Sequence, residues 1–212
     1  MAKLLGFMLQ GTVVTLEIFF LTLLFSIPLA LPVALARRSR LRLIRLPVSF
    51  YVLVMRGTPL ILQIIFVYFV PYYLLRLSYD RFTAVIVAFV INYAAYFAEI
   101  YRGGIDSIPK GQWEAAKVLG LSPARTLFSV ILPQVVRRIL PATSNEVMTL
   151  VKDTALAQTI GVAELFRAAQ NASAREFSTL PIFIAGVFYF VMNWIVTLGF
   201  GAAERKLSYY KV

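Results

Sequence analysis

The chain has 212 residues, of which 60% are hydrophobic, and its mean hydropathy is +0.79. A soluble domain of this length cannot bury so much apolar surface, so part of that surface must face lipid. The sequence contains no cysteine and no histidine, which excludes cysteine redox chemistry, disulfide bonds and nearly all transition-metal sites. The net charge of +11 does not indicate nucleic-acid binding, because the basic residues lie between apolar stretches, where membrane topology and anionic headgroups explain them.

Four apolar stretches are long enough to cross a bilayer core of about 30 Å, which takes about 20 mainly apolar residues. They cover residues 11–36, 58–75, 82–101 and 180–200. The first is too long for a signal peptide and no small-residue cleavage site follows it, so we expect a retained helix. A fifth stretch, 130–151, contains Arg137, Arg138, Asn145 and Glu146, and hydropathy alone leaves it open as a span.

Lysine and arginine gather on one side of these stretches. Six lie between residues 36 and 58, six lie between 101 and 139, and three lie in the tail, whereas the other six of the 21 are elsewhere. Cytoplasmic loops carry the excess of basic residues. We therefore expect the N-terminus outside, the C-terminus in the cytoplasm, and the segment 108–133 in the cytosol.

The segment 108–133 is predicted to form two short helices joined at a bend. Pro109 can begin the first helix, and Gly120 permits the left-handed residue that ends it. Ser122 and Pro123 form a typical cap and first-turn pair for a second helix. The segment is therefore a compact polar element inside a membrane chain.

Within this segment, Glu114, Ala115 and Ala116 are followed by Gly120 and then by the run 130–133, Val-Ile-Leu-Pro. The spacing resembles the EAA loop of permease subunits of bacterial ATP-binding-cassette (ABC) importers, with Val130 as a conservative departure. The resemblance implies a coupling helix, on whose surface small Ala115 and Ala116 let an ATPase approach while Glu114 pairs with a donor of that ATPase. An ordinary amphipathic connector is the alternative.

Other segments resemble the polar amino-acid branch of the same permeases, and together they cover nearly the whole chain: 11–12, 56–60, 101–113, 152–161 and 204–208. The resemblance implies an all-α polytopic fold of the type I ABC importer kind, with about five spans that include 130–151. We expect a single permease domain over 1–212 in a bacterial plasma (inner) membrane. The resemblance also implies three protein partners: a cytoplasmic ABC ATPase dimer, a second permease that is a copy or a paralogue, and an extracytoplasmic amino-acid-binding protein.

No Gly-Lys-Ser/Thr closes a glycine loop in this sequence, so the usual means of binding and hydrolysing ATP is absent. Gly103 and Gly104 lack the surroundings of a dinucleotide-binding turn. We expect no enzyme activity and no cofactor in this chain, with ATP and Mg²⁺ bound by the partner ATPase.

Glu17 lies within the first apolar stretch, where a carboxylate needs a cation, a donor or a proton. One interpretation is that it faces a central aqueous cavity and meets an amino group or cationic side chain of the substrate. The other is a structural pair with Lys152 or a shielded, protonated carboxyl group.

Three further residues are candidates for substrate binding. Asp153 could receive an ammonium group and Lys152 a carboxylate, so this pair suits a zwitterion, although a plain helix end is equally compatible. Asn92 shares one helix face with Tyr96 and Glu99, and it lies deep enough to line a cavity. Glu99 is expected to pair with Arg102 instead.

Two acidic groups, Glu17 and Asp153, would suit a cationic amino acid such as arginine, lysine or histidine. Glutamine or another polar amino acid is the main alternative. A secondary carrier should show inverted repeats, which this chain lacks, and a channel or a lipid-sensing signalling protein has no reason to carry a complete docking loop.

Overall fold

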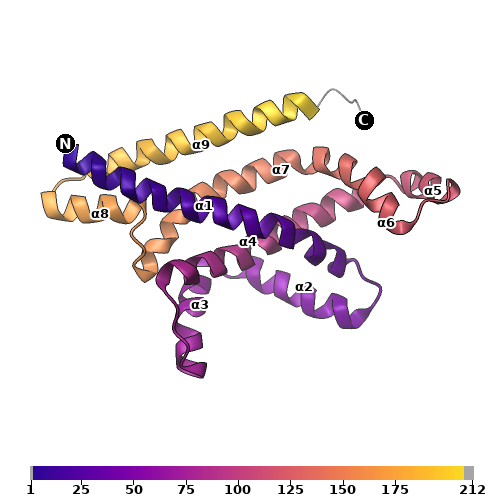
Figure 1. Cartoon of the computed structure of the whole chain (residues 1–212), viewed down its shortest axis with the longest axis horizontal. Helices are drawn as coiled ribbons and strands as arrows, with labels where there is room; N and C mark the ends of the chain where they lie inside the picture. The colour runs from indigo at the N-terminus through magenta and orange to yellow at the C-terminus, as the bar shows by residue number, and fades with distance from the viewer. Residues whose placement is uncertain (1, 208–212) are drawn as a thin grey trace.

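The computed structural model describes residues 2–207. In this range every regular element is a helical segment, and eleven follow one another along the chain (Figure 1). They are α1 (Ala2–Arg37), α2 (Arg42–Gly57), α3 (Leu60–Leu75), α4 (Arg81–Asp106), α5 (Lys110–Val118), α6 (Pro123–Arg125), the π-helical η1 (Thr126–Ile131), α7 (Leu132–Asp153), the 3-10 helix η2 (Thr154–Ile160), α8 (Leu165–Glu176) and α9 (Leu180–Leu207). The predicted all-α polytopic architecture is confirmed.

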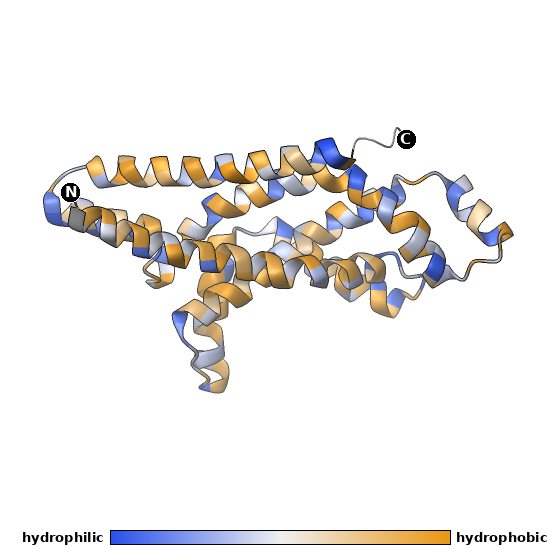
Figure 2. Cartoon of the chain, turned by 45° about the horizontal axis from the view of Figure 1, so that its top comes forward, coloured by the Kyte–Doolittle hydropathy of each residue, from blue (hydrophilic) through white to orange (hydrophobic). Residues whose placement is uncertain are grey.

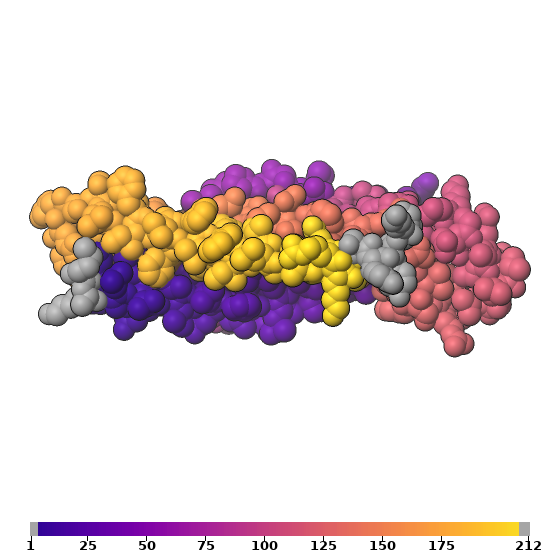
Figure 3. All heavy atoms as spheres, turned by 90° about the horizontal axis from the view of Figure 1, so that it is seen from above, coloured from indigo at the N-terminus to yellow at the C-terminus, as the bar shows by residue number. Residues whose placement is uncertain are grey.

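The long helices run along one axis, with α8 at one end of the molecule and α5 at the other (Figures 1 and 3). By length and composition α1, α4 and α9 could each span a membrane, and α2 and α3 together form a fourth, bent candidate. α7 is too polar to be counted by composition, yet it packs against α4 and α9 as a fifth long helix. Figure 2 shows α9 as hydrophobic over most of its length, with its hydrophilic residues near the C-terminal end.

The second span differs from its prediction. We expected a basic loop up to residue 57 and a span over 58–75, but residues 42–57 form α2 and α3 turns away from α2 by 114°. α2 packs on α1 and α4 with Val52 buried, while Arg42 and Arg45 stay exposed. The Tyr51 hydroxyl on α2 also donates a hydrogen bond to the Ile91 carbonyl oxygen of α4 (2.5 Å).

α4 is the central helix of the bundle. It makes its most extensive contact with α1, and small residues on both helices, Ala30 and Ala34 on α1 and Ala88 and Ala98 on α4, share one buried cluster. Small side chains let two helices approach closely in a membrane. Aromatic rings of α4 fill the rest of this cluster, where Phe89 stacks on Tyr93.

α8 lies at the end of the molecule opposite α5 and packs against α1 and α9. Glu164, the N-cap residue of α8, helps to hold it there. The buried carboxylate accepts hydrogen bonds from the backbone N–H groups of Phe166 and Arg167 and from the Tyr189 hydroxyl of α9. Burial raises the pKa of Glu164, and these donors oppose that rise. A Cβ atom on Gly11 would lie 2.9 Å from the Leu165 Cα atom, so glycine there permits the close approach of α1 to α8.

Candidate functional site

Asp153, at the last turn of α7, is held by a partner on α4. The Tyr93 hydroxyl donates a hydrogen bond of 2.7 Å to Asp153 Oδ2, and Tyr93 itself is only 1% exposed. The carboxylate is half-buried. A phenol on a rigid, buried helix fixes the orientation of the carboxylate and leaves further lone pairs for an incoming donor such as an ammonium group.

Lys152 is exposed beside Asp153. Within the described residues neither Asp153 nor Glu17 forms an ion pair with Lys152. Adjacent residues of a helix point about 100° apart, which keeps the two charges of Lys152 and Asp153 separate. The pair between Glu17 and Lys152 that was one alternative for Glu17 is thus not formed within one subunit.

A second acidic residue, Glu146, shares the helix face of Asp153. The two are seven residues apart on α7, which is two turns and about 10 Å along the axis. Glu146 is half-buried, as Asp153 is. From the sequence, Glu146 was expected only to weaken the fifth span as a charged residue, although its spacing from Asp153 was the signal for a paired role.

Asn92 belongs to a hydrogen-bond network at the break between α2 and α3. Its Nδ2 atom donates to the Met55 carbonyl oxygen (3.1 Å) and to Gln63 Oε1 (2.9 Å), and Gln63 Nε2 donates to the Met55 and Thr58 carbonyl oxygens (3.0 and 3.1 Å). Pro59 has no N–H to reach the Met55 carbonyl four residues earlier. The two amides therefore compensate the break, and the donors of Asn92 are already engaged.

Glu17 lies on the opposite face of α1 from the bundle interior. Thr15, Ile18, Thr22 and Ser26 are buried on the inner face. Glu17 is exposed together with Val13, Phe20 and Leu24, and these four residues, the outer stripe of α1, follow helical spacing. The expectation that Glu17 and Asp153 face one cavity therefore has no support within one subunit.

Glu99 forms an ionic cluster between three helices. It pairs with Arg102 of α4 (Nε to Oε1, 2.8 Å), as predicted, and also with Arg37 of α1 and Arg56 of α2 (Nη1 to Oε2, 3.3 Å). Arg56 further lies over the Tyr96 ring, with 5.3 Å between the guanidinium carbon and the ring centroid. One carboxylate thus joins three arginines, and from the sequence two of these, Arg37 and Arg56, were expected only to set the membrane topology.

The first of the two short helices predicted in the segment 108–133 is present as α5. Gly120 has φ of +71°, and the Leu121 N–H reaches the Ala116 carbonyl while the Gly120 N–H reaches that of Lys117, both at 3.0 Å. This pair of bonds is a Schellman motif, which needs a left-handed residue after the helix. Ser122 caps α6 by accepting from the Arg125 N–H, so the predicted turn chemistry is confirmed.

The exposed face of α5 differs from its prediction at Ala116. Glu114 and Ala115 are exposed, but Ala116 is buried, because it lies one turn after half-buried Trp113 on the side of α5 that packs against η1. Val118 and Leu119 are instead 88% and 76% exposed. Val118 and Leu119 are therefore exposed aliphatic residues at the end of a polar helix, and the sequence pattern did not single them out.

Tyr93 was missed as well. Its partner Asp153 lies 60 residues away in the sequence, so no local spacing could indicate their contact. The available signal was indirect, since a tyrosine beside Asn92 in an otherwise apolar span requires a partner for its hydroxyl group.

Comparisons with known proteins agree with this fold. Residues 10–209 match the family model described as binding-protein-dependent transport system inner membrane component. The chain is 42% identical to the L-cystine transport system permease protein TcyB of Bacillus subtilis (strain 168), over 94% of this chain and 86% of that protein. It is 40% identical to the arginine transport system permease protein ArtQ of the same organism, over 95% and 93%. In a crystal structure of an amino acid ABC transporter with histidines, one chain is 34% identical and superposes with a TM-score of 0.89, over 97% of this chain and 96% of that one.

Proposed function

Because the chain belongs to the family of binding-protein-dependent transport system inner membrane components, and is a permease subunit of an amino-acid ABC importer, we propose that it imports a cationic amino acid. The observation that carries this proposal is the pair of half-buried carboxylates, Asp153 and Glu146, on one face of α7. Asp153 would receive the α-ammonium group, and Glu146 the positive side chain of arginine, lysine or histidine. A charge pair is worth more in a water-poor pathway than at an open surface.

Lys152 would receive the substrate carboxylate, since it is exposed beside Asp153 and carries no ion pair in the described chain. Asn92 supports the same region indirectly, by holding the α2–α3 break in place beside Tyr93. The arginine permease at 40% identity supports a cationic substrate, and the cystine permease at 42% supports a wider amino-acid range. Glutamine or another polar amino acid is thus the alternative substrate.

The motor would be a cytoplasmic ABC ATPase dimer that binds ATP and Mg²⁺ and docks on α5. Glu114, Ala115, Val118 and Leu119 form the exposed face that it would contact, and Gly120 fixes the end of that helix. A second permease subunit would complete the pathway, and an extracytoplasmic binding protein would deliver the amino acid on the α8 side. In this arrangement the N-terminus would lie outside and α5 in the cytoplasm of an inner-membrane protein.

The test is uptake by the reconstituted complex, with arginine and glutamine offered separately. We expect Glu146→Gln to lower arginine uptake by about tenfold or more, as for loss of one desolvated charge partner, while glutamine uptake changes little. Asp153→Asn should lower uptake of both, because every amino acid carries the α-ammonium group. Equal losses for both substrates in Glu146→Gln would contradict the cationic assignment and leave the permease function standing. Uptake without the ATPase would instead favour a secondary carrier or a channel.

A further inference from the structure

α3 and the chain that follows it project from the bundle as an arm. We define this arm as residues 66–79. Figure 1 shows α3 running across the direction of the long helices and away from them, in accord with its 114° turn from α2. The return segment is held to the helix by the Tyr79 hydroxyl, which donates to the Val67 carbonyl oxygen (2.9 Å).

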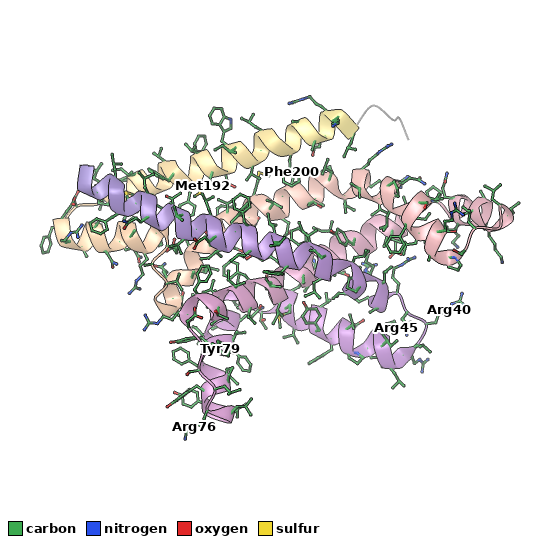
Figure 4. The ribbon with its side chains drawn as sticks, in the orientation of Figure 1. Arg40, Arg45, Arg76, Tyr79, Met192 and Phe200 are labelled. Carbon is green, nitrogen blue, oxygen red and sulfur yellow. The ribbon has the colours of Figure 1, made fainter. Side chains whose placement is uncertain are left out.

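The surface of the arm is largely uncovered in a single subunit. Phe66, Phe69, Tyr73 and Leu75 are all exposed, Tyr73 by 72%. Arg76 lies at the tip of the arm, and Tyr79 lies nearer the bundle (Figure 4). The guanidinium of Arg76 stacks on the Tyr72 ring (5.6 Å to the centroid) and has no ion pair among the described residues.

The depth of the arm excludes plain lipid as its surroundings. Figure 1 shows α3 leaving the bundle at the level at which α1 is about halfway along, and a helix of 36 residues is about 54 Å long. A hydrocarbon core of about 30 Å placed on α1 therefore includes this level. Non-helical backbone such as residues 76–80, and an unpaired arginine, are not tolerated against lipid at that depth.

Glu17 presents the opposite charge at the same level. It lies 15 residues after the start of α1 and 20 residues before Arg37, hence also near the middle of the helix. Its carboxylate accepts no hydrogen bond and joins no ion pair in the part of the chain that the structure describes. It is surrounded on the outer stripe of α1 by exposed Val13, Phe20 and Leu24.

Two copies of a membrane protein in the same orientation are related by a two-fold axis parallel to the membrane normal, and rotation about that axis keeps every residue at its own depth. The arm of one copy can therefore meet the middle of α1 in another. We propose that the arm lies across the outer stripe of α1 in a second copy of this chain, with Arg76 paired to Glu17 of that copy. The inference rests on the proposed function, in which two permease subunits share one pathway, and it gives Glu17 a role between subunits.

The contact can be tested by cross-linking, because the chain contains no cysteine. Two differently tagged copies are expressed together with the ATPase, one with Glu17→Cys and the other with Arg76→Cys, and the purified complex is mildly oxidised. We expect a covalent dimer that carries both tags, with at least about tenfold more product than a control. In that control Leu43→Cys, at an exposed position of α2, replaces Glu17→Cys. A second pair, Phe20→Cys with Tyr73→Cys, reports on the same contact and leaves both charges in place.

Charge reversal gives an independent measurement. Glu17→Arg and Arg76→Glu should each weaken association between the tagged copies by about tenfold or more, and the two together should restore it. Co-purification of the copies without a disulfide in either pair, or without rescue, would overturn the arm contact and leave the permease function intact. A complex in which two copies of this chain never co-purify would overturn the second copy as the occupant. Failure of the unmutated complex to couple uptake to ATP hydrolysis would instead contradict the proposed function.

Discussion

The side-chain amide of Asn92 donates to the backbone carbonyl oxygen of Met55 at 3.1 Å, and it does so because Pro59 cannot. In an unbroken helix that carbonyl would receive the N–H of the residue four positions on. In a membrane no water replaces the missing donor. Asn92, a polar residue of the central helix α4, thus stabilises the turn between α2 and α3. This turn directs α3 sideways out of the bundle.

Replacement of Asn92 by leucine should therefore destabilise the fold. Gln63 Oε1 loses the N–H group that donates to it, and the Met55 carbonyl keeps only the donor from Gln63. We expect the free energy of unfolding to fall by about 1–3 kcal/mol. The measurement is the thermal midpoint of the purified complex, with Asn145→Leu, at an exposed position of α7, as the control. A raised KM for the amino acid at unchanged stability would show that Asn92 contacts substrate instead.

Gly104 and its neighbour Gly103 offer a matched pair for the packing of α4 on α7. A Cβ atom on Gly104 would lie 2.3 Å from Ile139 Cγ2 and 2.8 Å from Val135 Cγ1, whereas one on Gly103 meets nothing within 4 Å. We expect Gly104→Ala to cost about 1–3 kcal/mol through overpacking. Gly103→Ala should be neutral or stabilising by up to about 1 kcal/mol, since alanine favours the helix. Equal thermal midpoints for the two variants would contradict this packing.

Local chemistry could be predicted from the sequence wherever a few adjacent residues decide the structure. The end of α5 at Gly120 and the start of α6 at Ser122 are examples, because caps depend on short-range hydrogen bonds. The burial of Ala116 could not be predicted from the motif alone, since it depends on how α5 rolls against η1.

Contacts between distant parts of the chain could not be predicted from the sequence. The Tyr93–Asp153 bond and the outward direction of Glu17 depend on how the helices rotate about their axes. Hydropathy predicts the length of a span but not the rotation of its helix about the helix axis. It also gave no indication of the amphipathic helix α2, because that helix lies in a basic segment. Pro59 indicated a break in the helix at Thr58–Pro59, but the angle of the turn could not be predicted.

The coupling role of α5 predicts a specific lesion at Gly120. Valine there must adopt the left-handed φ of +71°, which costs about 1–2 kcal/mol or more for a β-branched residue, so the chain after α5 should shift. We expect Gly120→Val to impair ATPase association and uptake while the protein still inserts, and Glu114→Lys to act similarly by charge reversal. Gly111→Val, at an exposed glycine with open space around it, is the control. Co-purification of the ATPase at the unmutated level in both Gly120→Val and Glu114→Lys would rule out this docking face.

Orientation in the membrane can be measured in intact cells with single cysteines, because the chain itself has none. Ala174 and Gly111 are exposed positions near opposite ends of the molecule, on α8 and α5. The excess of lysine and arginine lies on the α5 side, and basic loops stay in the cytoplasm. We therefore expect a membrane-impermeant maleimide to label Ala174→Cys from outside, and to reach Gly111→Cys only after the membrane is permeabilised. Labelling of Gly111→Cys in intact cells would place α5 outside, where no cytoplasmic ATPase could dock on it, and would overturn the orientation and the coupling role together.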